Sequence, residues 1–238
     1  GRMKGALALC RLEFNAYFDS PVAYVFTVAF LSVTFWFFFR GFFVGNQIQM
    51  REYFFFLPWV FLIFIPAVTM RLWAEEKKMG TVEVLLTLPV KEYELVLGKF
   101  LAGFLFVFVS VFFSFSLPLT LSFLGKLDWG PVIGGYLGTC LLGAAYLSIG
   151  LFLSNFTKNQ IVAFILTILL SFTLFILGED VILVNLPDFW VPFFSFLGLG
   201  KHFVSIQRGI IDSRDIVYYL SVTGFFLFLN VLFVTKRR

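Results

Sequence analysis

The residues best able to take part in chemistry are concentrated in one segment, 71–99. Only 13% of the 238 residues are charged, yet this segment holds five acids and five bases. They are Glu75, Glu76, Glu83, Glu92, Glu94, Arg71, Lys77, Lys78, Lys91 and Lys99. Charges of both signs in a short stretch favour ion pairs with another protein, while an ordinary solvated loop is the alternative. The segment is therefore a candidate docking site for a soluble partner.

Local signals divide this segment into short helices. Gly80 ends a first helix, since glycine adopts the left-handed conformation found just past helix ends. Thr81 is the predicted N-cap of a second helix, with Glu83 in its first turn, where the helix dipole favours an anion. Pro89 ends this second helix. Its apolar edge, too small to form a core alone, consists of Leu85, Leu86 and Leu88.

No catalytic motif occurs outside this segment. The single histidine, His202, falls in a predicted loop without a motif around it, and we expect it to be solvated. Cys10 and Cys140 are too few for a metal site or a disulfide framework. The sequence contains no phosphate-binding loop of the Gly-x-x-x-x-Gly-Lys-Ser/Thr type. We therefore expect no enzymatic activity, no bound cofactor and no metal in this chain.

The composition indicates that these residues are positioned by membrane helices. Apolar residues make up 60% of the chain and aromatic residues 21%, and the mean hydropathy is +0.96. Ordinary soluble domains are about 25% charged, roughly twice the fraction found here. The net charge of +4 is dispersed along the chain, which argues against nucleic acid as a partner. The sequence thus predicts an all-α integral membrane protein.

Six stretches without any charged residue or histidine are long enough to cross a bilayer, which takes about 17–25 helical residues. These predicted transmembrane helices are 22–39, 53–70, 100–123, 134–153, 161–177 and 217–234. We expect the whole chain, 1–238, to form one transmembrane domain. Ion channels and ion-coupled transporters usually carry ionisable groups within their spans, so the uncharged spans disfavour both classes.

The distribution of basic residues predicts the orientation. Six spans place both termini on one side, and that side carries twelve of the eighteen basic residues. The twelve are Arg2, Lys4, Arg11, Arg71, Lys77, Lys78, Lys91, Lys99, Lys158, Lys236, Arg237 and Arg238. Because basic residues are enriched in cytoplasmic segments, we expect cytoplasmic termini and a cytoplasmic loop over 71–98.

Two further segments flank the spans. Residues 4–18 form a predicted amphipathic helix on the cytoplasmic membrane surface, and Ser20-Pro21 separates it from the first span. The alternative is a simple extension of that span. Residues 187–199 are aromatic but broken by proline and glycine, so we expect a re-entrant or interfacial hairpin on the outer side, between spans five and six.

Small residues indicate helix contacts within the spans, and a proline indicates a kink. Gly134, Gly138 and Gly143 in the fourth span allow close approach of a neighbouring helix. We expect packing within the chain, with a subunit interface as the alternative. Pro118 predicts a kink in the third span.

The charged segment also carries a family resemblance. Its motif is Glu75-Glu76, then Gly80-Thr81-x-Glu83-x-Leu85-Leu86 and Pro89, after a second span that contains Pro66. With the amphipathic start, the six spans and the outer hairpin, the chain resembles the permeases of the ABC type-2 exporter family. Within that family it looks most like gliding-motility-associated bacterial permeases. One departure is Lys91, where a capping Ser, Thr or Asp would be the better helix start.

The resemblance implies a half-transporter in the bacterial inner membrane. Such permeases pair with a second permease chain, identical or related, and each docks on a separate ATPase subunit that binds ATP and magnesium. It also implies that the 71–98 loop couples ATP hydrolysis to export of a lipid-like or amphiphilic substrate. The residues that take this role are Glu75, Glu76, Gly80, Thr81, Glu83, Leu85 and Leu86. The alternative function is a membrane anchor that transmits force in an envelope or gliding machine.

Overall fold

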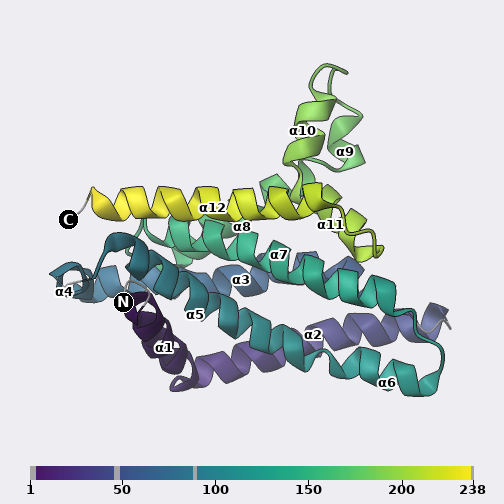
Figure 1. Cartoon of the computed structure of the whole chain (residues 1–238), viewed down its shortest axis with the longest axis horizontal. Helices are drawn as coiled ribbons and strands as arrows, with labels where there is room; N and C mark the ends of the chain where they lie inside the picture. Colours follow the sequence, from purple (N-terminus) through teal and green to yellow (C-terminus); the bar gives the residue numbers. More distant parts are fainter. Residues whose placement is uncertain (1–3, 46–48, 88–89, 237–238) are drawn as a thin grey trace.

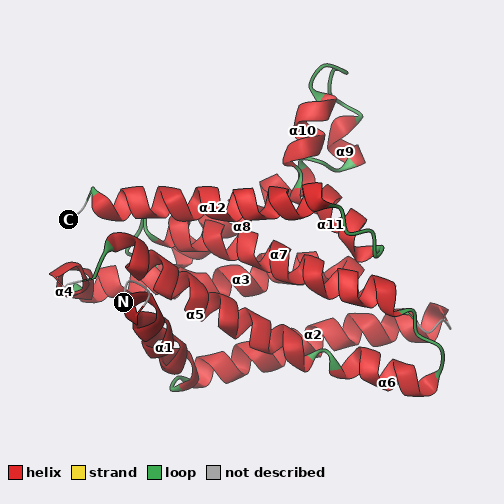
Figure 2. Ribbon diagram, viewed as in Figure 1, coloured by secondary structure: helices red, strands yellow, loops and turns green. Residues whose placement is uncertain are grey.

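The computed structural model describes residues 4–45, 49–87 and 90–236, and within these ranges it contains helices and no strand (Figure 2). The prediction of an all-α protein is confirmed. The helices are α1 Lys4–Phe18, α2 Pro21–Gly45, α3 Arg51–Met79, α4 Thr81–Thr87, α5 Glu92–Phe113, α6 Ser116–Leu124, α7 Trp129–Ser154, α8 Gln160–Ile176, α9 Asp180–Leu183, α10 Val191–Leu197, α11 Leu199–Gln207 and α12 Ser213–Thr235.

The long helices run side by side along the longest dimension of the molecule (Figure 1). At one end, which we call the charged end, α1 and α4 lie near the last turns of α3, the first turns of α5 and both chain termini (Figure 1). We call the opposite end the far end. It contains the N-terminal turns of α3 and α7.

Among the described helices, five are long and apolar enough to cross a membrane: α2, α3, α5 together with α6, α7 and α12. The predicted fifth span corresponds to α8, which is apolar but has only 17 residues. At a rise of 1.5 Å per residue it reaches about 26 Å, at the lower limit for a bilayer core.

The centre of the bundle is formed by α3 and α7. These two helices pack along each other, and α7 also contacts α8, α11 and α12. Their facing side chains are fully buried, as shown by Phe61 and Ile65 on α3 and by Leu142 and Tyr146 on α7. In contrast, α2 and α12 leave much of their apolar surface exposed, as expected for helices that face lipid.

The glycines of α7 lie against other helices of the same chain. A methyl group added at Gly134 would come within 2.6 Å of the carbonyl oxygen of Ile206 on α11. At Gly138 it would lie 3.1 Å from the Ile206 side chain, and at Gly143 it would lie 3.3 Å from the Phe61 ring. Small residues here allow α3 and α11 to approach the α7 backbone closely.

The third predicted span is interrupted, as Pro118 indicated. α5 ends at Phe113 and α6 begins at Ser116. Proline has no N–H to donate to the carbonyl four residues earlier, which here belongs to Ser114. The hydroxyl of Ser114 accepts a 2.6 Å hydrogen bond from Tyr53 on α3, so the break is joined to the centre of the bundle.

The first helix is separate from the first span, and the predicted break at Ser20-Pro21 is confirmed. α1 ends at Phe18, α2 begins at Pro21, and the Ser20 hydroxyl accepts a hydrogen bond from the N–H of Val22. α1 packs against α5. The contact is close at Gly98, where a β-carbon would lie 3.1 Å from the carbonyl oxygen of Ala6.

The segment between α8 and α12 differs from its prediction in detail. α9 and α10 stand off the side of the bundle as a pair (Figure 1), with exposed aromatic residues such as Phe189 and Phe193. His202 lies in α11 and not in a loop. It is not solvated either, because its Nδ1 lies 2.6 Å from the Asp215 carboxylate and its ring stacks on Tyr218.

Candidate functional site

The charged end begins with the last two turns of α3. The sequence suggested a separate short helix before Gly80, but α3 continues without a break from the second predicted span to Met79. Gly80 stops it, as predicted. Its φ of 74° lies in the left-handed region, and its N–H donates to the carbonyl of Glu76. Residues 71–79 are therefore a rigid continuation of a buried helix.

The short helix α4 follows directly and has seven residues. Thr81 does not cap it as predicted. The Thr81 hydroxyl instead donates a 3.3 Å hydrogen bond to the Glu76 carbonyl, and so completes the end of α3. Glu83 is exposed in the first turn of α4, and Leu85 packs against the core.

Three predicted features of this helix lie outside the described residues. They are Pro89, the expected end of the second helix, Leu88 of its apolar edge, and the side chain of Leu86. Of the predicted docking residues, Gly80, Thr81 and Glu83 are exposed and Glu75 is partly exposed.

The two adjacent glutamates have different surroundings. Glu75 is 38% exposed and forms an ion pair of 3.3 Å with Arg71, one helical turn earlier. Glu76 is 16% exposed and faces the neighbouring helices. Sequence reasoning grouped both with the docking surface, but the structure directs Glu76 toward α1 and α5.

Glu76 belongs to a cluster of three charges around Lys99. The Lys99 ammonium lies 2.5 Å from a carboxylate oxygen of Glu76 and 2.5 Å from one of Glu13. Lys99 is only 1% exposed, and its ammonium also lies 5.0 Å from the centre of the Trp73 ring. Because Glu13, Glu76 and Lys99 belong to α1, α3 and α5, this ion cluster joins three helices.

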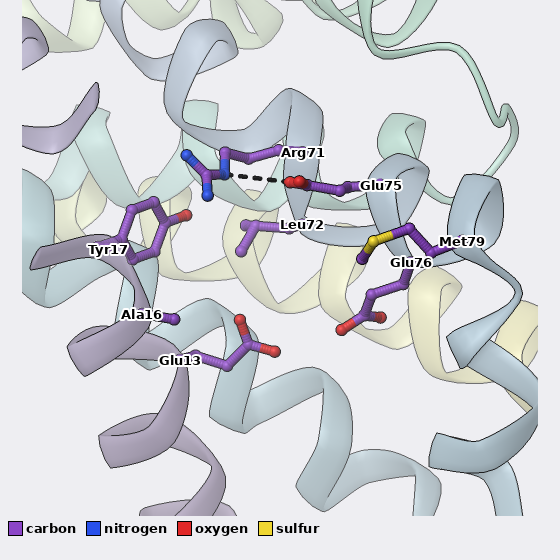
Figure 3. A pocket seen from close by; sticks show the side chains of 8 residues that line it. All are labelled: Glu13, Ala16, Tyr17, Arg71, Leu72, Glu75, Glu76 and Met79. Atoms are coloured by element: carbon purple, nitrogen blue, oxygen red, sulfur yellow. Dashed lines mark ion pairs between the residues drawn. The ribbon is translucent and has the colours of Figure 1, made fainter. Parts of the chain in front are cut away.

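A pocket of about 230 Å³ opens beside the cluster, between α1 and α3 (Figure 3). Figure 3 shows the carboxylates of Glu13 and Glu76 on one side and the Arg71–Glu75 ion pair on the other. The Tyr17 hydroxyl donates to the Val68 carbonyl at 3.1 Å. Across the described residues, no group of three or more His, Cys, Asp or Glu side chains is placed to hold a metal ion. The acids here serve in ion pairs.

A second set of contacts fixes the other side of the α3 terminus. The Ser154 hydroxyl, at the end of α7, accepts from the N–H groups of Trp73 and Ala74 and donates to the Met70 carbonyl, each at 3.1 Å. Lys77 donates to the carbonyl of Asn155. The Asn155 amide in turn donates to Asn230 of α12 at 2.8 Å. The last turns of α3 are thereby attached to α7 and α12 as well.

The start of α5 is capped by Glu94, which the sequence analysis named only among the charged residues of the segment 71–99. Glu94 accepts a 3.1 Å hydrogen bond from the N–H of Lys91, which forms one half of a capping box. This contact compensates for the unfavourable N-cap residue Lys91. A glutamate three residues after the cap was the signal in the sequence.

No curated protein matches the chain. The protein family described as "ABC-2 family transporter protein" matches residues 44–235, which include α3 to α12 and leave out α1. The match does not single out the gliding-motility permeases. Since the match covers most of the chain, including the segment 71–99, the protein belongs to the ABC-2 transporter family.

Proposed function

We propose that this protein is the permease subunit of an ATP-driven exporter and receives the force of ATP hydrolysis at α4. The observation that carries the proposal is the position of α4. It follows a left-handed turn at Gly80, exposes Glu83, and continues a helix end that is attached to α1, α5, α7 and α12. A displacement of α4 by a partner would therefore reach most of the bundle.

The partner in this proposal is a separate ATPase subunit, which binds ATP and magnesium. ABC-2 family membership supports such a partner in general. We further propose that a second permease chain, identical or related, completes the transporter, that the whole chain acts as one transmembrane domain, and that the cargo is amphiphilic. The proposed location is the bacterial inner membrane.

We also propose six spans, with α8 as the fifth, and cytoplasmic termini. The position of both chain ends at the charged end supports an even number of crossings (Figure 1). The greater number of basic residues at that end supports its cytoplasmic location.

Thiol labelling tests this orientation. In a chain with Cys10 and Cys140 replaced by serine, single cysteines introduced at Asp128 and Asp188 should react with a membrane-impermeant reagent in intact cells. A cysteine at Met79, which is 62% exposed, should react only after the cells are opened. Labelling of Met79→Cys from outside would reverse the orientation and remove the basis for ATPase docking at α4.

Docking is tested by copurification with an ATPase subunit. Gly80→Pro should disrupt the turn between α3 and α4, because proline fixes φ near −65° and the glycine has a φ of 74°. Glu83→Lys places a cation in the first turn of α4 and reverses any ion pair with the partner. That pair can contribute several kcal/mol. Both variants should insert at normal levels yet lose the ATPase subunit or ATP-driven activity.

Arg40→Glu provides the control, because Arg40 is an exposed charge near the C-terminal end of α2, which lies at the far end of the molecule (Figure 1). This variant should retain the ATPase subunit. Normal association and coupling by both Gly80→Pro and Glu83→Lys would show that α4 is a solvated linker and that docking occurs elsewhere.

A further inference from the structure

The largest cavity described at the far end has a volume of about 530 Å³. It lies where the N-terminal ends of α3 and α7 meet the C-terminal end of α11. Its charged lining residues are Arg51, Arg208 and Asp128, and the rest of the lining is mostly apolar. The proposed coupling function uses none of these residues.

The balance of charge in this cavity favours an anion. Neither Arg51 nor Arg208 forms an ion pair with any residue that the structure describes. The only carboxylate of the lining, on Asp128, already accepts a 3.0 Å hydrogen bond from the N–H of Gly130 as the N-cap of α7. Two arginines therefore line the cavity together with one partly engaged carboxylate.

The backbone around the cavity adds to this preference. Arg51 is the first residue of α3, and the preceding residue, Met50, provides no side-chain acceptor for the free N–H groups of that helix end. Arg208 is held in place by the next residue, Gly209, whose φ of 83° brings the chain against Gly130 and Pro131 of α7. Arg208 is thus placed by closely packed backbone, and Arg51 lies beside the free N–H groups of a helix N-terminus.

A second cavity of about 370 Å³ lies next to the first one, and both are lined by Phe55, Val204 and Gln207. Apolar side chains dominate its remaining lining, among them Trp59, Phe172, Phe175 and Ile176. Glu179 also lines it, and burial raises the pKa of its carboxyl above the ordinary value, which favours the neutral form.

Gln207 lies at the junction of the two cavities. Its side-chain oxygen is buried and has no hydrogen-bond partner within the described part of the chain. Buried polar atoms are usually hydrogen-bonded, so this oxygen is available to a donor of a bound molecule.

From these observations we propose that the far end binds an amphiphile. Its anionic headgroup lies at Arg51 and Arg208, and its aliphatic chain lies in the second cavity, which Trp59 lines. Guanidinium groups bind phosphate and carboxylate with paired hydrogen bonds, and the second cavity is apolar enough for hydrocarbon. The headgroup hydroxyls or amines of such a molecule could donate to Gln207. This site is separate from the proposed ATPase docking surface.

Native mass spectrometry of the purified full-length chain tests the proposal with two lipids of equal chain length. Phosphatidylglycerol, which is anionic, should bind at least about tenfold more tightly than zwitterionic phosphatidylcholine. The double variant Arg51→Gln, Arg208→Gln should lose about tenfold in affinity for phosphatidylglycerol, since it removes two charge-assisted contacts. Arg40→Gln, which removes an exposed cation outside both cavities, should bind as tightly as the unchanged chain.

Two further measurements identify the occupant. Val204→Phe, which fills the junction of the cavities, should weaken binding of phosphatidylglycerol, and millimolar inorganic phosphate should fail to displace this lipid. Equal affinities of the two lipids, or unchanged affinity in the double arginine variant, would overturn the proposal. Displacement by inorganic phosphate would overturn it too, because the site would then take a free anion. No ATPase subunit is needed, so these results are independent of the docking experiments.

Discussion

Replacing Lys99 by methionine should destabilise the chain by on the order of 3 kcal/mol, because it leaves two carboxylates together without their shared cation. Lys99 is 1% exposed and lies 2.5 Å from both Glu13 and Glu76. The loss should appear as a lower midpoint of thermal unfolding, measured in detergent by the fraction of chain that remains monodisperse after heating.

Two comparison variants make this result specific to the ion cluster. Lys78→Met removes an exposed lysine from the same segment and should leave the midpoint unchanged. The triple variant with Lys99→Met, Glu13→Gln and Glu76→Gln should recover much of the loss, because a neutral cluster no longer leaves unpaired charge in a largely buried site. If Lys99→Met unfolds at the same midpoint as the unchanged chain, the cluster contributes nothing to stability.

Features that depend on neighbouring residues could be predicted from the sequence, whereas this ion cluster could not. Hydropathy located every long apolar helix that the structure describes, because the length of an uninterrupted apolar stretch can be read from neighbouring residues alone. Gly80, Pro118 and Ser20-Pro21 marked their breaks correctly, since each acts on the backbone within a few residues. Such signals can be found without knowledge of the tertiary structure.

Contacts between distant residues could not be found in this way. Lys99 is 86 residues from Glu13 and 23 from Glu76, and neither spacing corresponds to a helical repeat. Glu76 therefore looked equivalent to Glu75 in the sequence, although α3 directs it toward α1 and α5. The prediction for His202 failed for the same reason, because its partner Asp215 belongs to the next long helix.

The role of Thr81 failed for a different reason. A threonine that follows a glycine can act as the N-cap of the next helix, or it can donate a hydrogen bond to a carbonyl at the end of the previous helix. In the structure its hydroxyl donates to Glu76, because the left-handed turn at Gly80 brings it back over the end of α3. The direction of the backbone after Gly80 decided between these two roles of Thr81, and the residue types alone did not determine that direction.

The glycine positions of α7 lead to the second large effect, expected for Gly134→Ala. The added methyl group would lie 2.6 Å from the carbonyl oxygen of Ile206 and 3.0 Å from the α-carbon of Gly209. Both are backbone atoms, so no side-chain rotation relieves the overlap, and α11 must move away from α7. Overpacking of this kind costs about 1–3 kcal/mol. The midpoint of thermal unfolding in detergent should fall accordingly.

Gly224→Ala is the matched control, since Gly224 also lies inside a membrane-length helix but has no atom within 4 Å of the added methyl group. Alanine favours helix by about 1 kcal/mol over glycine, so this variant should unfold at the same or a higher temperature. An equal or higher midpoint for Gly134→Ala as well would contradict the close contact between α7 and α11. Because Gly209 follows Arg208 directly, displacement of α11 should also weaken the binding of phosphatidylglycerol at the far end.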